Sequence, residues 1–111
     1  MSEPRRPASA TDLAGRWFPA DGRAEGRAYV EFAPSGEWVG SDGCNGQRGT
    51  WHVGPLGAFR GTAGPSTKIA CENVPLASWI ADAARAEIDG AALALRDGRG
   101  VEIGRLVRHR P

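Results

Sequence analysis

Two cysteines and two histidines are the side chains in this sequence best suited to nucleophilic chemistry or metal binding: Cys44, Cys71, His52 and His109. A metal site needs about four ligands, and these residues follow neither C-x-x-C nor H-x-x-H spacing. A cysteine could use His52 as a base, but the flanking residues supply no known nucleophile signature and no group that would orient the base. We therefore predict inert thiols, with no metal, no cofactor and no catalytic residue.

The serines, glycines and carboxylates lead to the same prediction. No serine stands in a G-x-S-x-G turn. The glycines that flank Arg99 fall in a hairpin turn, whereas a phosphate loop lies between a strand and a helix. Asp82, Glu87 and Asp89 lie around the end of a predicted helix, where solvated charge is the ordinary explanation. The sequence therefore predicts a protein that is not an enzyme.

The elements that would position these side chains are short strands joined by turns. The sequence contains 16 glycines and 8 prolines, and such frequent interruption is typical of antiparallel strands. Alternation predicts strands over residues 29–32, 37–39, 49–53, 91–95 and 101–103, with a weaker strand over 58–63. In the last hairpin the inward-facing residues are expected to be Leu93, Leu95, Val101 and Ile103. Leu106 is out of phase with them, and a β-bulge at Gly104 would absorb the shift.

One segment, residues 75–86, has the period of a helix. Its apolar residues recur three and four positions apart, and they are Leu76, Trp79, Ile80, Ala83 and Ala84. Asn73 and Pro75 are suitable residues for its beginning. The predicted core consists of inward strand residues and one helix residue: Val30, Phe32, Trp51, Val53, Ile80, Leu93, Leu95 and Ile103.

The composition is that of one small domain. A chain of 111 residues with 41% hydrophobic and 24% charged residues can form one core. No apolar run approaches the roughly 20 residues of a membrane-spanning helix. The net charge of +1 argues against nucleic acid as a partner. The basic residues near the C-terminus are interpreted as a solvated end: Arg105, Arg108 and Arg110, with His109.

The first residues differ from the rest because they are rich in Pro, Arg and Ser and have no periodicity. They predict a disordered leader over residues 1–11, followed by one domain over residues 12–111. The leader lacks the apolar segment of roughly 7 to 15 residues that a secretory signal requires. A cytoplasmic protein is therefore expected, and we expect it to be a monomer.

Three motifs, in order and spacing, resemble those of the META domain (HslJ-like) family. The first is L-x-G-x-W, formed by Leu13, Gly15 and Trp17. The second is G-C-N-x-x-x-G, formed by Gly43, Cys44, Asn45 and Gly49. The third is similar to T-x-M-A-C and contains Thr67, Ala70 and Cys71, with Ile69 in place of methionine. We interpret all three as structural, although the second could form a nest of backbone N–H groups that binds a ligand.

The resemblance implies a mainly β (α+β) fold, a small, antiparallel, strongly curved, barrel-like sheet with one helix packed on it. It also implies that Cys44 and Cys71 lie close together, either as a disulfide or as adjacent thiols. Free thiols are expected in a reducing cytoplasm, with oxidation on exposure to air.

Two functions remain open at this point. The resemblance favours a non-enzymatic, stress-related module that binds a protein partner through its β-surface. The alternative is a carrier that holds a small apolar ligand in a pocket of the curved sheet. A filled interior with exposed apolar residues would favour the first, and a deep pocket would favour the second.

Overall fold

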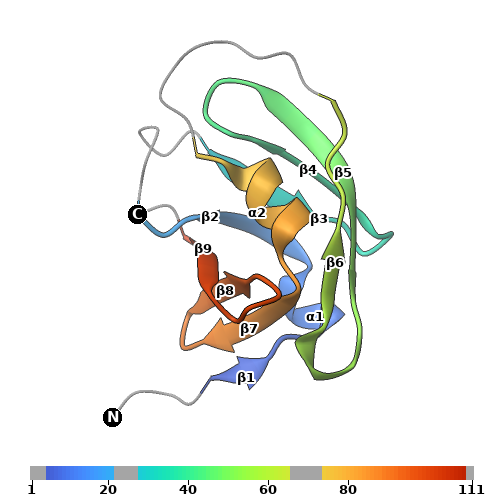
Figure 1. Cartoon of the computed structure of the whole chain (residues 1–111). Coiled ribbons are helices and arrows are strands. Elements are labelled where there is room, and N and C mark those ends of the chain that lie inside the picture. Colours follow the sequence, from blue (N-terminus) through green and yellow to red (C-terminus); the bar gives the residue numbers. More distant parts are fainter. Residues whose placement is uncertain (1–4, 22–27, 66–73, 110–111) are drawn as a thin grey trace.

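A computed structural model describes residues 5–21, 28–65 and 74–109, which form one antiparallel sheet and two helices (Figure 1). The sheet has nine strands in the order β1-β7-β8-β9-β2-β3-β4-β5-β6. In sequence order the elements are β1 (Arg6–Pro7), α1 (Ala10–Leu13), β2 (Gly15–Pro19), β3 (Tyr29–Phe32), β4 (Glu37–Ser41), β5 (Gly46–Val53), β6 (Phe59–Gly61), α2 (Leu76–Asp82), β7 (Arg85–Asp89), β8 (Ala92–Arg96) and β9 (Glu102–Val107). The predicted mainly β, antiparallel class is confirmed.

The strands predicted from alternation are present, and most of their predicted inward residues form the core. Val30 and Phe32 on β3 are completely buried, and Trp51 on β5 is buried beside them. The Phe32 and Trp51 rings meet edge to face with centroids 5.3 Å apart, a favourable aromatic geometry. Val53 is half-buried and packs against the same core.

The predicted helix is shorter than its sequence pattern. It begins at Leu76 after Pro75 and ends at Asp82, because Ala83 has the extended angles φ −66° and ψ 135°. The following residues form β7, a strand that the sequence analysis missed, and Ala84 donates its N–H to Arg96 O. Asn73, the other predicted start residue, lies outside the described residues.

The bulge in the last hairpin falls one residue before the predicted position. Leu95 pairs with Gly104 and Arg96 pairs with Glu102, so Ile103 is the extra residue on β9. Ile103 is consequently half-buried rather than fully buried. Val101 was expected to face inward and is 56% exposed, so that part of the prediction is wrong.

The N-terminal segment is folded from residue 6 onward, so the predicted leader over residues 1–11 does not hold for residues 6–11. Arg6 and Pro7 pair with β7, and the Ala8 side chain is buried. The helix α1 begins with a capping box in which Ser9 and Asp12 satisfy each other's backbone N–H groups. The buried side chain of Leu13 packs α1 into the core.

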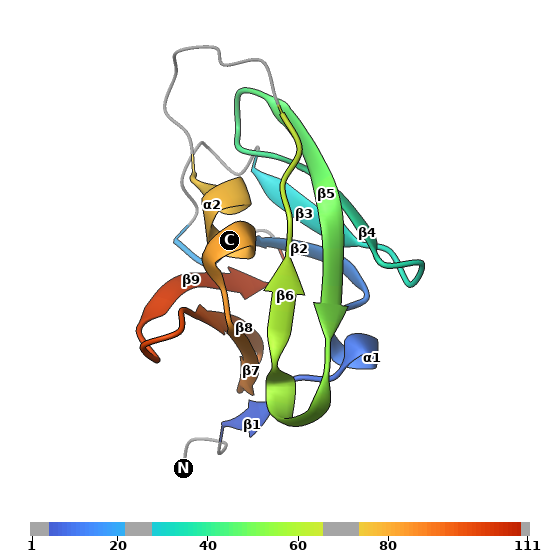
Figure 2. The same ribbon diagram turned by 45° about the vertical axis from the view of Figure 1, so that its right-hand side comes forward.

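The helix α2 lies against β5, β6 and β9, as the two views of the ribbon show (Figures 1 and 2). Near it, the beginning of β6 meets the beginning of β7, where Phe59 donates its N–H to Ala84 O over 3.0 Å. The strand order runs from β1 at one edge to β6 at the other. The barrel-like closure implied by the resemblance stays a prediction.

Candidate functional site

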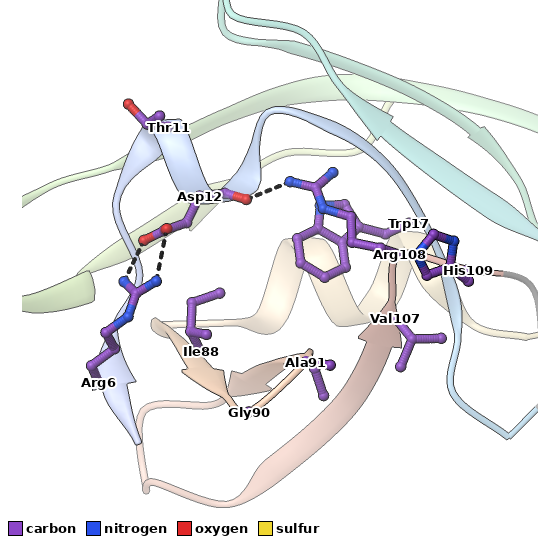
Figure 3. A pocket seen from close by; sticks show the side chains of 11 residues that line it. Arg6, Thr11, Asp12, Trp17, Ile88, Gly90, Ala91, Val107, Arg108 and His109 are labelled. Atoms are coloured by element: carbon purple, nitrogen blue, oxygen red, sulfur yellow. Dashed lines mark hydrogen bonds and ion pairs between the residues drawn. The ribbon is translucent and has the colours of Figure 1, made fainter. Parts of the chain in front are cut away.

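A surface pocket of about 520 Å³ lies where α1, the end of β9 and the β7–β8 turn meet (Figure 3). It is built by residues from both ends of the chain and from the middle of the sheet. The lining residues are Arg6, Thr11, Asp12, Trp17, Ile88, Gly90, Ala91, Ala92, Val107, Arg108 and His109.

The Arg108 guanidinium is held in this pocket by three hydrogen bonds and by one aromatic ring. Its Nη2 donates to Asp12 O over 2.6 Å and to Ala14 O over 2.9 Å, and its Nη1 donates to Arg16 O over 3.3 Å. The guanidinium carbon lies 3.9 Å from the centroid of the Trp17 ring, which is a cation–π contact. Burial lowers the pKa of Arg108, and the nearby Asp12 charge partly opposes that shift.

The residues of the first motif, Leu13, Gly15 and Trp17, pack around this guanidinium. Leu13 is completely buried, and its carbonyl accepts the indole N–H of Trp17 over 2.8 Å, which holds the ring beneath Arg108. Gly15 has φ +114°, and a Cβ at this position would lie 2.6 Å from Arg108 Nη1. A side chain at residue 15 would therefore displace the guanidinium. Leu13 thus holds the indole ring in place, Gly15 leaves space for the guanidinium, and Trp17 stacks on it.

An ion pair closes the opposite side of the pocket. Arg6 donates to Asp12 through two nitrogens at 2.7 and 3.0 Å, as Figure 3 shows. The hydrogen bond from Arg6 is the largest cause that holds the pKa of Asp12 well below its usual range, and the bonds from Ser9 act in the same direction. Asp12 is therefore ionised at neutral pH, and its charge is matched by Arg6.

The structure corrects the interpretation of the basic C-terminal residues as a solvated end. Arg105 pairs with Asp89 and Glu102, each at 2.9 Å. Arg108 ties the end of β9 to the carbonyls that follow α1. The side chain of His109 is exposed at the pocket edge, and Arg110 lies outside the described residues.

We predict that Arg108→Ala lowers the free energy of unfolding by about 1–3 kcal/mol, because three backbone carbonyls lose a charged donor. Arg108→Lys should recover only part of this loss. The planar guanidinium spreads its donors over two nitrogens, whereas the compact ammonium group of lysine has a single nitrogen. Urea unfolding measures both, with Arg99→Ala in an exposed turn as the control of equal charge. Equal free energies of unfolding for Arg108→Ala and Arg99→Ala would show that the hydrogen bonds of Arg108 do not stabilise the fold.

The second family motif closes the turn between β4 and β5. The buried Asp42 carboxylate accepts the N–H groups of Cys44 and Asn45 over 2.8 and 2.7 Å, and Gly43 has φ +103°. Because Asp42 already satisfies these donors, they do not form an open nest for an anion. The run of residues 42–46 is rich in residue types that accept positive φ and bond to their own backbone, which predicts the tight connection seen here, with Asp42 as its acceptor.

The remaining predicted residues are only partly placed. Cys44 is disulfide-bonded in the structure. Thr67, Ala70 and Cys71 lie outside the described residues, so the proximity of Cys71 to Cys44 stays a prediction. His52 is exposed on β5. In the described ranges, no group of three or more His, Cys, Asp or Glu side chains is placed to hold a metal ion.

Comparison with known proteins identifies the family. The sequence matches the META domain over residues 10–109. Comparison with curated proteins and with solved structures gives no match. None of the helices in the described ranges is long and apolar enough to cross a membrane. A match over nearly the whole chain shows that the chain belongs to the META domain family.

Proposed function

We propose that this META domain is a non-enzymatic interaction module that binds a protein partner through the turn between β5 and β6. The observation that carries the proposal is Leu56, whose side chain is 78% exposed and whose backbone has φ +58° and ψ 26°. Both features are unfavourable for a leucine. A stress-related role would follow only from the family resemblance.

The turn has the geometry of type I′. Leu56 and Gly57 both have positive φ, at 58° and 76°, and Ala58 donates its N–H to Pro55 O over 3.2 Å. Such turns favour Asn-Gly, because asparagine tolerates this conformation better than leucine does. Local stability alone would therefore favour asparagine at residue 56. The exposed leucine instead supplies an apolar side chain that a protein partner would cover.

The turn is held against the body of the domain, so Leu56 is presented from a rigid support. A Cβ on Gly57 would lie 2.5 Å from Ala86 O and 3.2 Å from Pro7 Cβ, which shows how closely the backbone approaches β1 and β7. A preorganised anchor loses less conformational entropy on binding than a mobile one.

The packing of the interior favours a protein partner over a ligand held inside the sheet. Large buried side chains occupy the core, including Phe32, Trp38, Leu76, Ile80, Leu93, Leu95 and Leu106. These residues fill the space in which the carrier hypothesis would place its ligand. The pocket beside Arg108 lies at the surface and is a separate feature.

We predict that Leu56→Asn raises the free energy of unfolding by about 0.5–1 kcal/mol while it abolishes binding to the partner. Photo-leucine at position 56, which keeps the apolar side chain, identifies the partner, and unlabelled wild-type protein should compete for the adduct whereas Leu56→Asn should not. Val101→Asn, which replaces another exposed apolar residue, is the matched control and should compete like the wild type. Full competition by Leu56→Asn would refute the proposal.

A further inference from the structure

We infer that the pocket beside Arg108 binds a small amphipathic organic anion, a single carboxylate carried on an apolar chain. The inference rests on the pocket lining and is independent of the proposed role of Leu56, which lies in a different turn.

The floor of the pocket is apolar and comes from three strands. Trp17 on β2, Ile88 on β7 and Val107 on β9 line it, together with Ala91 and Ala92 at the β7–β8 turn. Figure 3 shows Ile88, Ala91 and Val107 around the hollow, with Trp17 and Arg108 above them. A volume of about 520 Å³ is within the range of small-molecule sites, which combine an apolar lining with a few polar groups.

The charges that line the pocket do not balance. Arg6 and Arg108 are cations, and among the described residues that line the pocket Asp12 is the only carboxylate. Asp12 is bound by two nitrogens of Arg6, whereas the bonds of Arg108 all go to neutral carbonyls. No carboxylate in the described part of the chain forms an ion pair with Arg108. The Asp12 carboxylate, which acts on the Arg108 charge without forming an ion pair with it, is already paired with Arg6. The two cations and one carboxylate leave a net positive charge, and a partly buried guanidinium there favours an anion, because a charged hydrogen bond strengthens when water is excluded.

The guanidinium also keeps donors for a ligand. An arginine side chain has five N–H donors, and the three bonds to Asp12, Ala14 and Arg16 use three of them. The exposed His109 lies at the same pocket and adds a polar side chain at its rim. One unmatched positive charge above an apolar floor fits one carboxylate with a hydrocarbon tail better than a polyanion.

The first test uses octanoate and its neutral analogue octanamide as probes with the ¹⁵N-labelled full chain. Octanoate should shift the indole N–H resonance of Trp17 and the amide resonances of Ala91 and Val107. Octanamide should bind about tenfold more weakly, because it lacks the charge that pairs with Arg108. Equal affinity for the two probes, or shifts that spare these three residues, would overturn the inference.

Charge changes at Ala91 make the test specific, because this residue is exposed in the turn and lines the pocket. Ala91→Glu should weaken octanoate binding about two- to fivefold and Ala91→Lys should strengthen it by a similar factor, as one exposed charge pair does. Gly98→Glu, in the remote β8–β9 turn where no atom lies within 4 Å of an added Cβ, should leave the affinity unchanged. The same response to all three variants would refute a local site. Leu56→Asn should bind octanoate normally, so the two proposals can fail separately.

Discussion

Leu95→Ala is expected to lower the free energy of unfolding by about 2–5 kcal/mol, the range for removing a fully buried leucine side chain. Leu95 is completely buried on β8, a central strand of the β7–β8–β9 part of the sheet. Its cross-strand partners are Ala86 on β7 and Gly104 on β9. Both partners are small, so neither can fill the space that the leucine leaves.

The helix above this position also limits relaxation. A Cβ on Gly104 would lie 2.4 Å from the Trp79 ring, so α2 already contacts the β9 backbone directly. Urea unfolding measures the loss, and an unchanged m-value would show that the change is in stability rather than in the denatured state. Val39→Ala, at a half-exposed position on β4, is the control and should change the stability by less than about 0.5 kcal/mol. A loss of that small size for Leu95→Ala would show that Leu95 is not in the core.

The strands and most of the core could be predicted from the sequence because alternation reports directly which side chains share a face. The limit of that signal is visible around Ala83 and Ala84. These alanines complete a helical stripe and equally suit the beginning of a strand, and local pattern cannot choose between the two. Pairing decides in favour of the strand, because Ala86 and Ile88 align with Leu95 and Leu93 on β8.

The N-terminal segment shows a different limit. A composition rich in proline and arginine predicted disorder, yet Ser9 and Asp12 form a capping box and Pro7 pairs with Glu87. The Ser-x-x-Asp spacing resembles the capping signature, but the box there usually ends in Glu or Gln and precedes a longer helix. The composition of the segment therefore favoured disorder over the short helix that the capping signal would have predicted.

The candidate site was missed because its parts are far apart in the chain. Arg108 bonds to Arg16 O across 92 residues and to Asp12 O across 96 residues. The motif supplied Gly15 and Trp17 without any indication of what the glycine makes room for. Among basic residues near a terminus, nothing local distinguishes an arginine that will be seated on a tryptophan from one that is solvated.

Gly49→Ala is expected to cost about 2–4 kcal/mol, although it adds only one methyl group, because that methyl has no space. Gly49 pairs with Trp38 across β4 and β5, and the Trp38 indole donates its N–H to Thr62 O over 2.8 Å. A Cβ on Gly49 would lie 1.9 Å from Thr62 O and 2.7 Å from Trp38 Nε1. Alanine would therefore have to break that hydrogen bond and push apart two segments that are joined by backbone bonds. Gly49, the final glycine of the second motif, is thus needed because the hydrogen bond from Trp38 to Thr62 leaves no room for a side chain.

A control on the same strand separates this steric cost from the general effect of replacing glycine. Gly46 is exposed at the beginning of β5, and no atom lies within 4 Å of its added Cβ. Gly46→Ala should leave the stability within about 0.5 kcal/mol of wild type or raise it, because alanine restricts the unfolded chain. Gly49→Ala should also change the ¹⁵N–¹H resonance of the Trp38 indole, whereas Gly46→Ala should not. Similar stabilities for the two variants would mean that the backbone at Thr62, just after β6, moves away from β5 easily, and the close contact at Gly49 would then not explain why the motif ends in glycine.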